Sequence, residues 1–136
     1  MTTTINAVAS TGLVETADGS GIIKVQSNGV TTNALAWVNF NGTTSPGTIR
    51  SAYNVGSVTK NGTGQYTVNF TTALSDANYA AFITVRPDGS NLVDTACIAD
   101  VTTGTYTTSA VRFWTGAASS GTARDANACC VAIFGN

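Results

Sequence analysis

Residues 36–89 read AWVNFNGTTSPGTIRSAYNVGSVTKNGTGQYTVNFTTALSDANYAAFITVRPDG, and this stretch decides the fold. Apolar and polar residues alternate within its segments, and turn-forming residues separate the segments, which is the pattern of consecutive antiparallel strands. Residues 61–64, NGTG, supply the Asn and Gly that accept the positive φ of a tight hairpin connection. In the QYTVNF that follows, the side chains of Tyr66, Val68 and Phe70 fall on one face. The stretch therefore predicts a β-meander with one buried face.

The same alternation continues on both sides of this stretch and predicts an all-β chain. We expect some eight short strands, with one helical turn in the connection at residues 71–78. The strand at residues 49–59 is expected to be continuous, with a bulge or bend at Gly56. These features indicate one antiparallel β-sandwich over residues 34–136, jelly-roll-like in its number of strands. The expected strands are residues 35–40, 49–59, 65–70, 79–86, 92–99, 105–114 and 128–134, with a short earlier strand at 21–26 that ends in a turn at 27–29.

Residues 1–33 form the other part of the expected organisation, an extended N-terminal arm. They are rich in Thr, Ser, Gly and Ala, and before the short strand their larger apolar residues are Ile5, Val8, Leu13 and Val14. Fully extended, such an arm reaches on the order of 100 Å at about 3.3 Å per residue. It is therefore long enough to cross onto a neighbouring subunit, although a frayed terminus has the same composition. These four residues are candidate contacts with a subunit or partner.

Apolar residues occupy both faces of the strands at residues 35–40 and 128–134. Such a strand belongs in the middle of a sandwich or beneath a covering arm or subunit, so we expect a homo-oligomer. Neighbouring residues in a strand point opposite ways, so only one of Phe113 and Trp114 faces the core. Trp37 and Trp114 are therefore further candidate contacts, at a subunit interface or, beside a loop, on a host sugar.

The runs AWVNFNGT at residues 36–43 and NGTGQYTVNFTTALSDANY at residues 61–79, with Tyr53-Asn54-Val55 between them, carry a family resemblance. They are similar to a module that recurs in structural proteins of tailed bacteriophages, many of which are described as tail-fibre or uncharacterised virion proteins. The resemblance covers about a third of the chain. It implies a virion component and, because such phage proteins commonly form trimers, a homotrimer. It brings no catalytic or ligand-binding residue with it.

Charge limits the partners that the chain can have. Charged residues make up 10% of the 136 residues, against about 25% in typical domains, and the net charge is −1. The six basic residues are scattered singly, whereas nucleic acids and anionic membranes require clusters of Lys and Arg. No apolar run is long enough to span a membrane, and the Thr-rich start lacks the regions of a secretory signal. We therefore expect no nucleic-acid partner, no membrane insertion, and assembly in the host cytoplasm.

Low charge and abundant hydroxyl side chains also suit particle and fibre proteins, because much of each subunit's surface meets another subunit. A soluble β-domain with little charge has the same composition. Three cysteines, Cys97, Cys129 and Cys130, are an odd number without metal-binding spacing. We interpret them as small apolar residues, at least one of the adjacent pair being buried, with a redox pair or intersubunit bridge as the alternative.

Side chains suited to catalysis or metal binding are few. The chain has no His, which excludes a Ser-His-Asp or Cys-His arrangement. Its carboxylates are interpreted as turn and solvent-face residues, because no two are placed in one cleft by their spacing. A calcium site near Asp88, Asn91 and Asp94 lacks a dense carboxylate spacing. We therefore expect no enzyme, cofactor or metal site. The carboxylates are Glu15, Asp18, Asp76, Asp88, Asp94, Asp100 and Asp125.

Two non-enzymatic functions compete on the virion exterior. The first is an oligomeric capsid decoration or cement protein that contacts the major capsid protein and stabilises the head lattice, its arm adding contact area. The alternative is a tail-fibre or tail-tip protein that contacts other tail proteins and binds a glycan or protein on the host surface. The arm and the short chain favour decoration.

Overall fold

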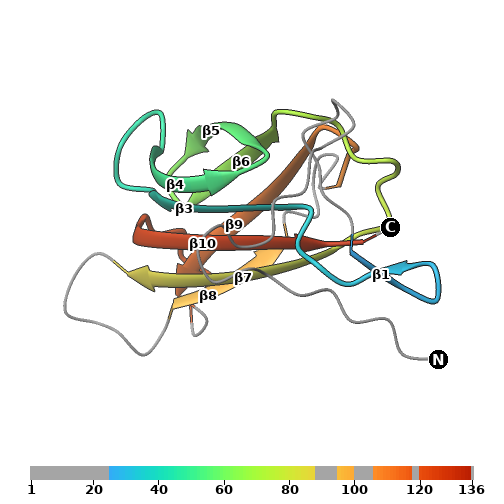
Figure 1. The fold of residues 1–136 in the computed structure, drawn as a ribbon. Coiled ribbons are helices and arrows are strands. Elements are labelled where there is room, and N and C mark those ends of the chain that lie inside the picture. Colours follow the sequence, from blue (N-terminus) through green and yellow to red (C-terminus); the bar gives the residue numbers. More distant parts are fainter. Residues whose placement is uncertain (1–24, 88–94, 100–105, 118–119, 136) are drawn as a thin grey trace, which may run out of the picture.

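The computed structural model describes residues 25–87, 95–99, 106–117 and 120–135, which contain strands and loops but no helix (Figure 1). Strands alternate with turns throughout these ranges, as the sequence predicts. The strands are β1 (Gln26–Ser27), β2 (Val30–Thr31), β3 (Ala36–Asn41), β4 (Thr48–Tyr53), β5 (Val55–Gly62), β6 (Gln65–Phe70), β7 (Ala80–Pro87), β8 (Thr95–Ala99), β9 (Ala110–Ala117) and β10 (Ala126–Phe134).

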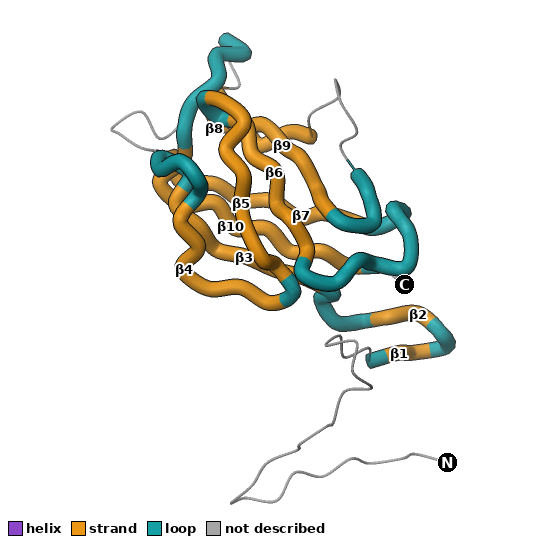
Figure 2. Tube along the Cα trace, turned by 90° about the horizontal axis from the view of Figure 1, so that it is seen from above, coloured by secondary structure: helices purple, strands orange, loops and turns teal. Residues whose placement is uncertain are grey.

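Strands β3 to β10 form two four-stranded antiparallel sheets, in the orders β4-β3-β10-β7 and β5-β6-β9-β8. The sheets pack face to face, and the β1–β2 hairpin stands off from them (Figure 2). The first and last strands of the sandwich are neighbours, with Val38 of β3 opposite Val131 of β10. The expected all-β antiparallel sandwich is confirmed. It has eight strands where the sequence predicts seven within residues 34–136, because the strand expected at residues 49–59 is two strands.

Aromatic rings from both sheets meet in the centre of the core. Phe40 of β3 lies 5.4 Å from Tyr66 of β6 and 6.2 Å from Phe113 of β9, measured between ring centroids. Strand alternation puts these residues in the core, as predicted for Tyr66, Val68 and Phe70 of β6. Phe113 is also buried, because its neighbour Trp114 points to the other face of β9. The other large side chains of the core are Leu35, Val38, Val58, Val68, Phe70, Leu74, Tyr79, Val111, Val131 and Ile133.

The prediction of one continuous strand at residues 49–59 is wrong, and so is the prediction of a simple meander, because this stretch is divided between the two sheets. Asn54 has a φ of 52° and ends β4, so that β5 joins the opposite sheet. Its side chain holds this corner: Nδ2 donates to the carbonyl oxygens of Leu35 and Thr72, and Oδ1 accepts from the Thr72 N–H at 2.8 Å. Asn tolerates a positive φ and bonds to nearby backbone, which is why it suits this corner.

Two other expected elements differ from the structure. Residues 71–79 contain no helical turn, and the Leu74 N–H instead donates to the Thr108 carbonyl at 2.8 Å. The strand expected from residue 105 begins as β9 at Ala110, because residues 107–109 turn the chain, while Tyr106 forms an isolated bridge to Val111. At residues 107–109 the turn is closed by hydrogen bonds between Thr107 and Ala110, including the Ala110 N–H to Thr107 Oγ1 at 2.9 Å.

The turn expected at residues 27–29 is confirmed in the β1–β2 hairpin. Asn28 and Gly29 have φ values of 51° and 77°, the pattern of a type I′ turn. The strand expected at residues 21–26 lies mostly outside the described residues, and so do Ile5, Val8, Leu13 and Val14.

Candidate functional site: an apolar sheet face above a polar clamp

The outward face of the β4-β3-β10-β7 sheet, here called the outer face, carries an apolar stripe. Trp37 of β3 lies opposite Tyr53 on one side and Ala132 on the other, and Ala132 is in turn opposite Phe82 of β7. The Phe134 ring packs edge-to-face on Phe82, with centroids 5.7 Å apart. Trp37 is 39% exposed and Phe82 is 64% exposed. These five residues define the stripe, which crosses four strands. Within the described part of the chain, Trp37 and Phe82 are its exposed rings, and Tyr53, Ala132 and Phe134 are half-buried.

A shallow hollow of about 320 Å³ lies beside the stripe, between Trp37, Phe82 and Cys130. Asn39 also lines it, but its amide is engaged: Nδ2 donates to the Cys130 Sγ at 3.0 Å, and Oδ1 accepts from Arg50 at 3.2 Å. The hollow therefore offers apolar contact and few free hydrogen-bonding groups. That chemistry suits the side chain of another protein better than a sugar, which needs hydrogen bonds to its hydroxyls.

The other end of the outer face is basic. Arg50 Nη2 donates to the Asn127 carbonyl at 2.7 Å, and Arg86 Nη2 donates to the Asn127 Oδ1 at 3.3 Å. Both arginines are exposed, and the sequences of the four strands contain no Asp or Glu. The outer face thus runs from an apolar stripe to a pair of cations without a carboxylate on the same strands.

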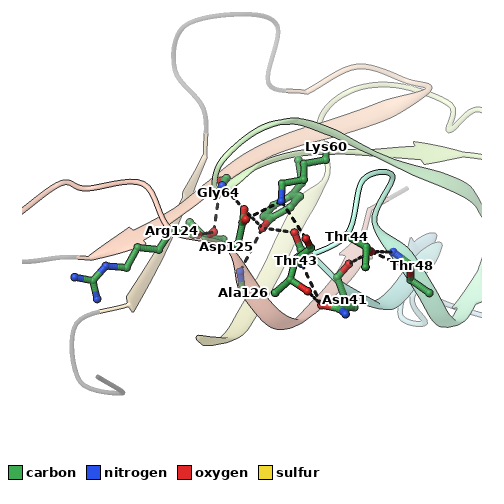
Figure 3. Close-up of polar contacts among 12 residues, drawn as sticks. Asn41, Thr43, Thr44, Thr48, Lys60, Gly64, Arg124, Asp125 and Ala126 are labelled. Atoms are coloured by element: carbon green, nitrogen blue, oxygen red, sulfur yellow. Dashed lines mark hydrogen bonds and ion pairs between the residues drawn. The ribbon is translucent and has the colours of Figure 1, made fainter. Parts of the chain in front are cut away.

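A second cluster, here called the clamp, joins three loops at the edge of the sandwich (Figure 3). Lys60 of β5 forms an ion pair with Asp125, with 2.7 Å between Nζ and Oδ2. Asp125 Oδ1 accepts from the Gly64 N–H at 2.8 Å and lies 3.1 Å from the Tyr66 hydroxyl. The same hydroxyl is 3.1 Å from the Gly42 carbonyl, so its one proton serves one of two acceptors. The clamp thereby ties the β3–β4 loop and the β5–β6 turn to the entry of β10.

Burial and hydrogen bonding act in opposite directions on the acid of the clamp. Burial alone would raise the pKa of Asp125, but the hydrogen bonds from Lys60, the Gly64 N–H and Tyr66 outweigh it and hold this pKa below its ordinary value of 3.8. Burial raises the pKa of the Tyr66 phenol well above its ordinary value of 10.0. Both groups keep one protonation state near pH 7, as structural groups do.

The lowered pKa of Asp125 predicts a loss of stability in acid. The ionised carboxylate stabilises the folded chain above its ordinary pKa of 3.8, and this contribution disappears as the pH falls through the lower folded pKa. Urea unfolding between pH 7 and pH 2.5 measures the effect. We expect the free energy of unfolding to fall below about pH 4 and to fall less steeply in Asp125→Asn. Parallel pH profiles for the two proteins would contradict this assignment.

The predicted contact residues fall in different places. Trp37 lies on the stripe, whereas Trp114 is half-buried on the other sheet, and the stripe does not include it. Of the adjacent cysteines, Cys129 is buried and Cys130 exposed, which confirms that at least one is buried. Sequence reasoning missed Phe82, although it is out of phase with Ile83 and Val85, which pack against the core.

Most of the carboxylates lie outside the described residues, including Asp88 and Asp94, the acids of the calcium site considered from the sequence. Of the two that are described, Asp76 accepts from the Asn78 N–H at 2.6 Å and Asp125 belongs to the clamp. Within the described part of the chain, no three His, Cys, Asp or Glu side chains come together as a possible metal site. The described residues also include no helix that is long and apolar enough to cross a membrane.

Comparisons with protein-family models, with curated proteins and with solved structures find no match to this chain.

Proposed function

We propose that this chain is a non-enzymatic structural protein on the exterior of a tailed-bacteriophage particle, an oligomeric decoration protein that stabilises the capsid lattice. The apolar stripe on the outer face is the observation that carries the proposal. The exposed rings of Trp37 and Phe82 lie on regular strands of one sheet. Trp37 is on β3, between β4 and β10, and Phe82 is on the edge strand β7, paired with β10. Aromatic side chains with few charges are the composition of the buried centre of protein interfaces.

The resemblance of residues 36–79 to phage structural proteins supports a place on a phage particle. The chemistry of the hollow favours a decoration protein over a host-binding protein. A receptor-binding tip for host glycan needs free polar groups beside its aromatic rings. The Asn39 amide at the hollow is already bonded to Cys130 and Arg50. The proposed partners are therefore further copies of the chain and the major capsid protein, and the resemblance to phage structural proteins favours a homotrimer.

A charge placed on the stripe tests this function. In the phage that encodes the chain, we expect Phe82→Glu to lower its incorporation into purified particles about tenfold, as for a residue central to an interface. Thr63→Glu adds the same charge at the exposed β5–β6 turn and serves as the matched control. Phe82 is 64% exposed, so the variant keeps its fold, which circular dichroism checks. Equal incorporation of the two variants would contradict the proposal.

A further inference from the structure

Among the described residues, the outer face carries two exposed aromatic rings, Trp37 and Phe82, and two exposed cations, Arg50 and Arg86, and the chain itself contains a segment of complementary chemistry. Residues 1–24 precede the first described residue and number four times the six residues of β3. At about 3.3 Å per residue they reach roughly 80 Å, whereas a six-residue strand spans about 20 Å. Before Lys24, the charges of this segment are the acids Glu15 and Asp18, which follow Leu13 and Val14.

The place where this segment joins the described chain is the apolar end of the outer face. The Val25 N–H donates to Asn33 Oδ1 at 2.7 Å, and two residues later the Leu35 N–H donates to the Ile133 carbonyl at 2.8 Å. Residue 25 is therefore held close to the start of β3 and the end of β10, where the stripe lies. The described chain therefore begins at this end of the sheet.

The spacing of the segment matches the spacing of the outer face. Along β7, Phe82, Thr84 and Arg86 alternate outward, from the stripe to the basic end. In an extended segment, Val14, Thr16 and Asp18 also share one face, with the same two-residue steps. When such a segment runs in the direction of β7 with Val14 on the stripe, Asp18 reaches the basic end. Thr16 then lies at the level of Thr84 and of Cys130, which pair across β7 and β10.

A second uncovered patch indicates that the segment comes from another copy. Val25 is 57% exposed and Val30 56% exposed, and the pairing of Ser27 with Val30 puts both valines on one face of the β1–β2 hairpin. The hairpin stands off from the sandwich (Figure 2). A segment folded back on its own sheet leaves this hairpin face without a use, whereas exchange between copies places a neighbouring molecule beside the sheet, where the hairpin face is available for contact.

We propose that residues 1–24 of a second copy of this chain dock along the outer face, with Val14 on the stripe and Asp18 at Arg50 and Arg86. This inference deepens the proposed function and rests on it for its biological meaning, because an exchanged segment links the copies of an assembly. Its test uses the purified chain alone, so its failure is distinct from a failure to enter particles.

Disulfide trapping in the full chain tests the register. In a Cys97→Ser background, Thr16→Cys is expected to form a disulfide with Cys130 of another copy under mild oxidation, because the proposed register puts residue 16 at the level of Thr84, which pairs with Cys130. Mass spectrometry of mixed light and heavy-isotope chains identifies links between copies. Thr4→Cys, in the same segment but twelve residues earlier, is the matched control and is expected to give at least tenfold less product.

Charge reversal provides a second readout with the same product. Arg86→Glu is expected to lower the yield of the Thr16→Cys product about threefold, the size of one exposed ion pair. Adding Asp18→Arg is expected to restore it. A link between residue 16 and Cys130 within one copy, a Cys130–Cys130 link between copies in the absence of Thr16→Cys, or no link at all would each overturn the proposal. The first outcome would show a segment folded on its own sheet, and the second would show two sheets packed on each other.

Discussion

Gly64→Ala is expected to lower the free energy of unfolding by about 4 kcal/mol, a large part of the roughly 5–15 kcal/mol by which native domains are stable. Gly64 has a φ of 66°, where a side chain costs about 1–2 kcal/mol, and its position is crowded. An added Cβ would meet the Thr115 carbonyl oxygen and lie 2.8 Å from the carbonyl oxygen of Arg124. Neither backbone can easily move, because Thr115 Oγ1 donates to that Arg124 carbonyl at 2.6 Å. Overpacking against two fixed segments adds about 1–3 kcal/mol.

Gly121→Ala is the matched control for this substitution. Gly121 has a φ of 64°, almost equal to that of Gly64, but apart from its chain neighbours no described residue has an atom within 4 Å of its added Cβ. It therefore carries the conformational cost alone, about 1–2 kcal/mol. Urea unfolding of both variants at pH 7 separates backbone strain from crowding. Equal losses in the two variants would contradict the close packing of the β5–β6 turn against β9 and the entry of β10.

Asp125→Ala is expected to destabilise the fold by about 3 kcal/mol. The substitution leaves Lys60 without its ion-pair partner, and the side chain of Lys60 is only 14% exposed. It also removes the acceptor of the Gly64 N–H, which holds the β5–β6 turn. Lys60→Met is expected to cost less, because an apolar chain replaces the buried cation while Asp125 keeps its bonds from Gly64 and Tyr66.

Asp76→Ala removes the other described carboxylate and is the control for loss of an acid. Asp76 is exposed and accepts one backbone hydrogen bond, from the Asn78 N–H. Its loss is expected to cost about 1 kcal/mol. Thermal unfolding of Asp125→Ala, Lys60→Met and Asp76→Ala ranks their stabilities, and we expect Asp125→Ala to be the least stable. If Asp76→Ala were equally damaging, the clamp would not be the main polar support of the loops.

The core of the fold follows from patterns within single strands. Alternation in residues 65–70 predicts that Tyr66, Val68 and Phe70 are buried, and they are. Because Phe113 and Trp114 are adjacent in one strand, only one of the two rings is predicted to face the core, and Phe113 is the one that is fully buried. Strand periodicity needs no information from elsewhere in the chain, since each side chain chooses between two faces only.

What the sequence did not predict depends on contacts between distant segments. Asn54 ends β4 because its side chain bonds to Leu35 and Thr72, so a corner replaced the expected continuous strand. The clamp joins Lys60 to Asp125 across 65 residues, and no spacing rule links them. Trp37 was a predicted contact, but Phe82 joins it only because β10 lies between β3 and β7. Because the stripe crosses four strands, it can be predicted only when the order of the strands in the sheet is known.

The most direct test of the central claim is the copy number of this chain in purified particles, measured by quantitative mass spectrometry against the major capsid protein. A decoration protein that covers the capsid lattice is expected in numbers comparable with the capsid protein. A count that matches the few appendages of one tail would contradict decoration and place the chain on the tail, where the outer face would serve a fibre or tip. Absence from the particle would contradict the account as a whole.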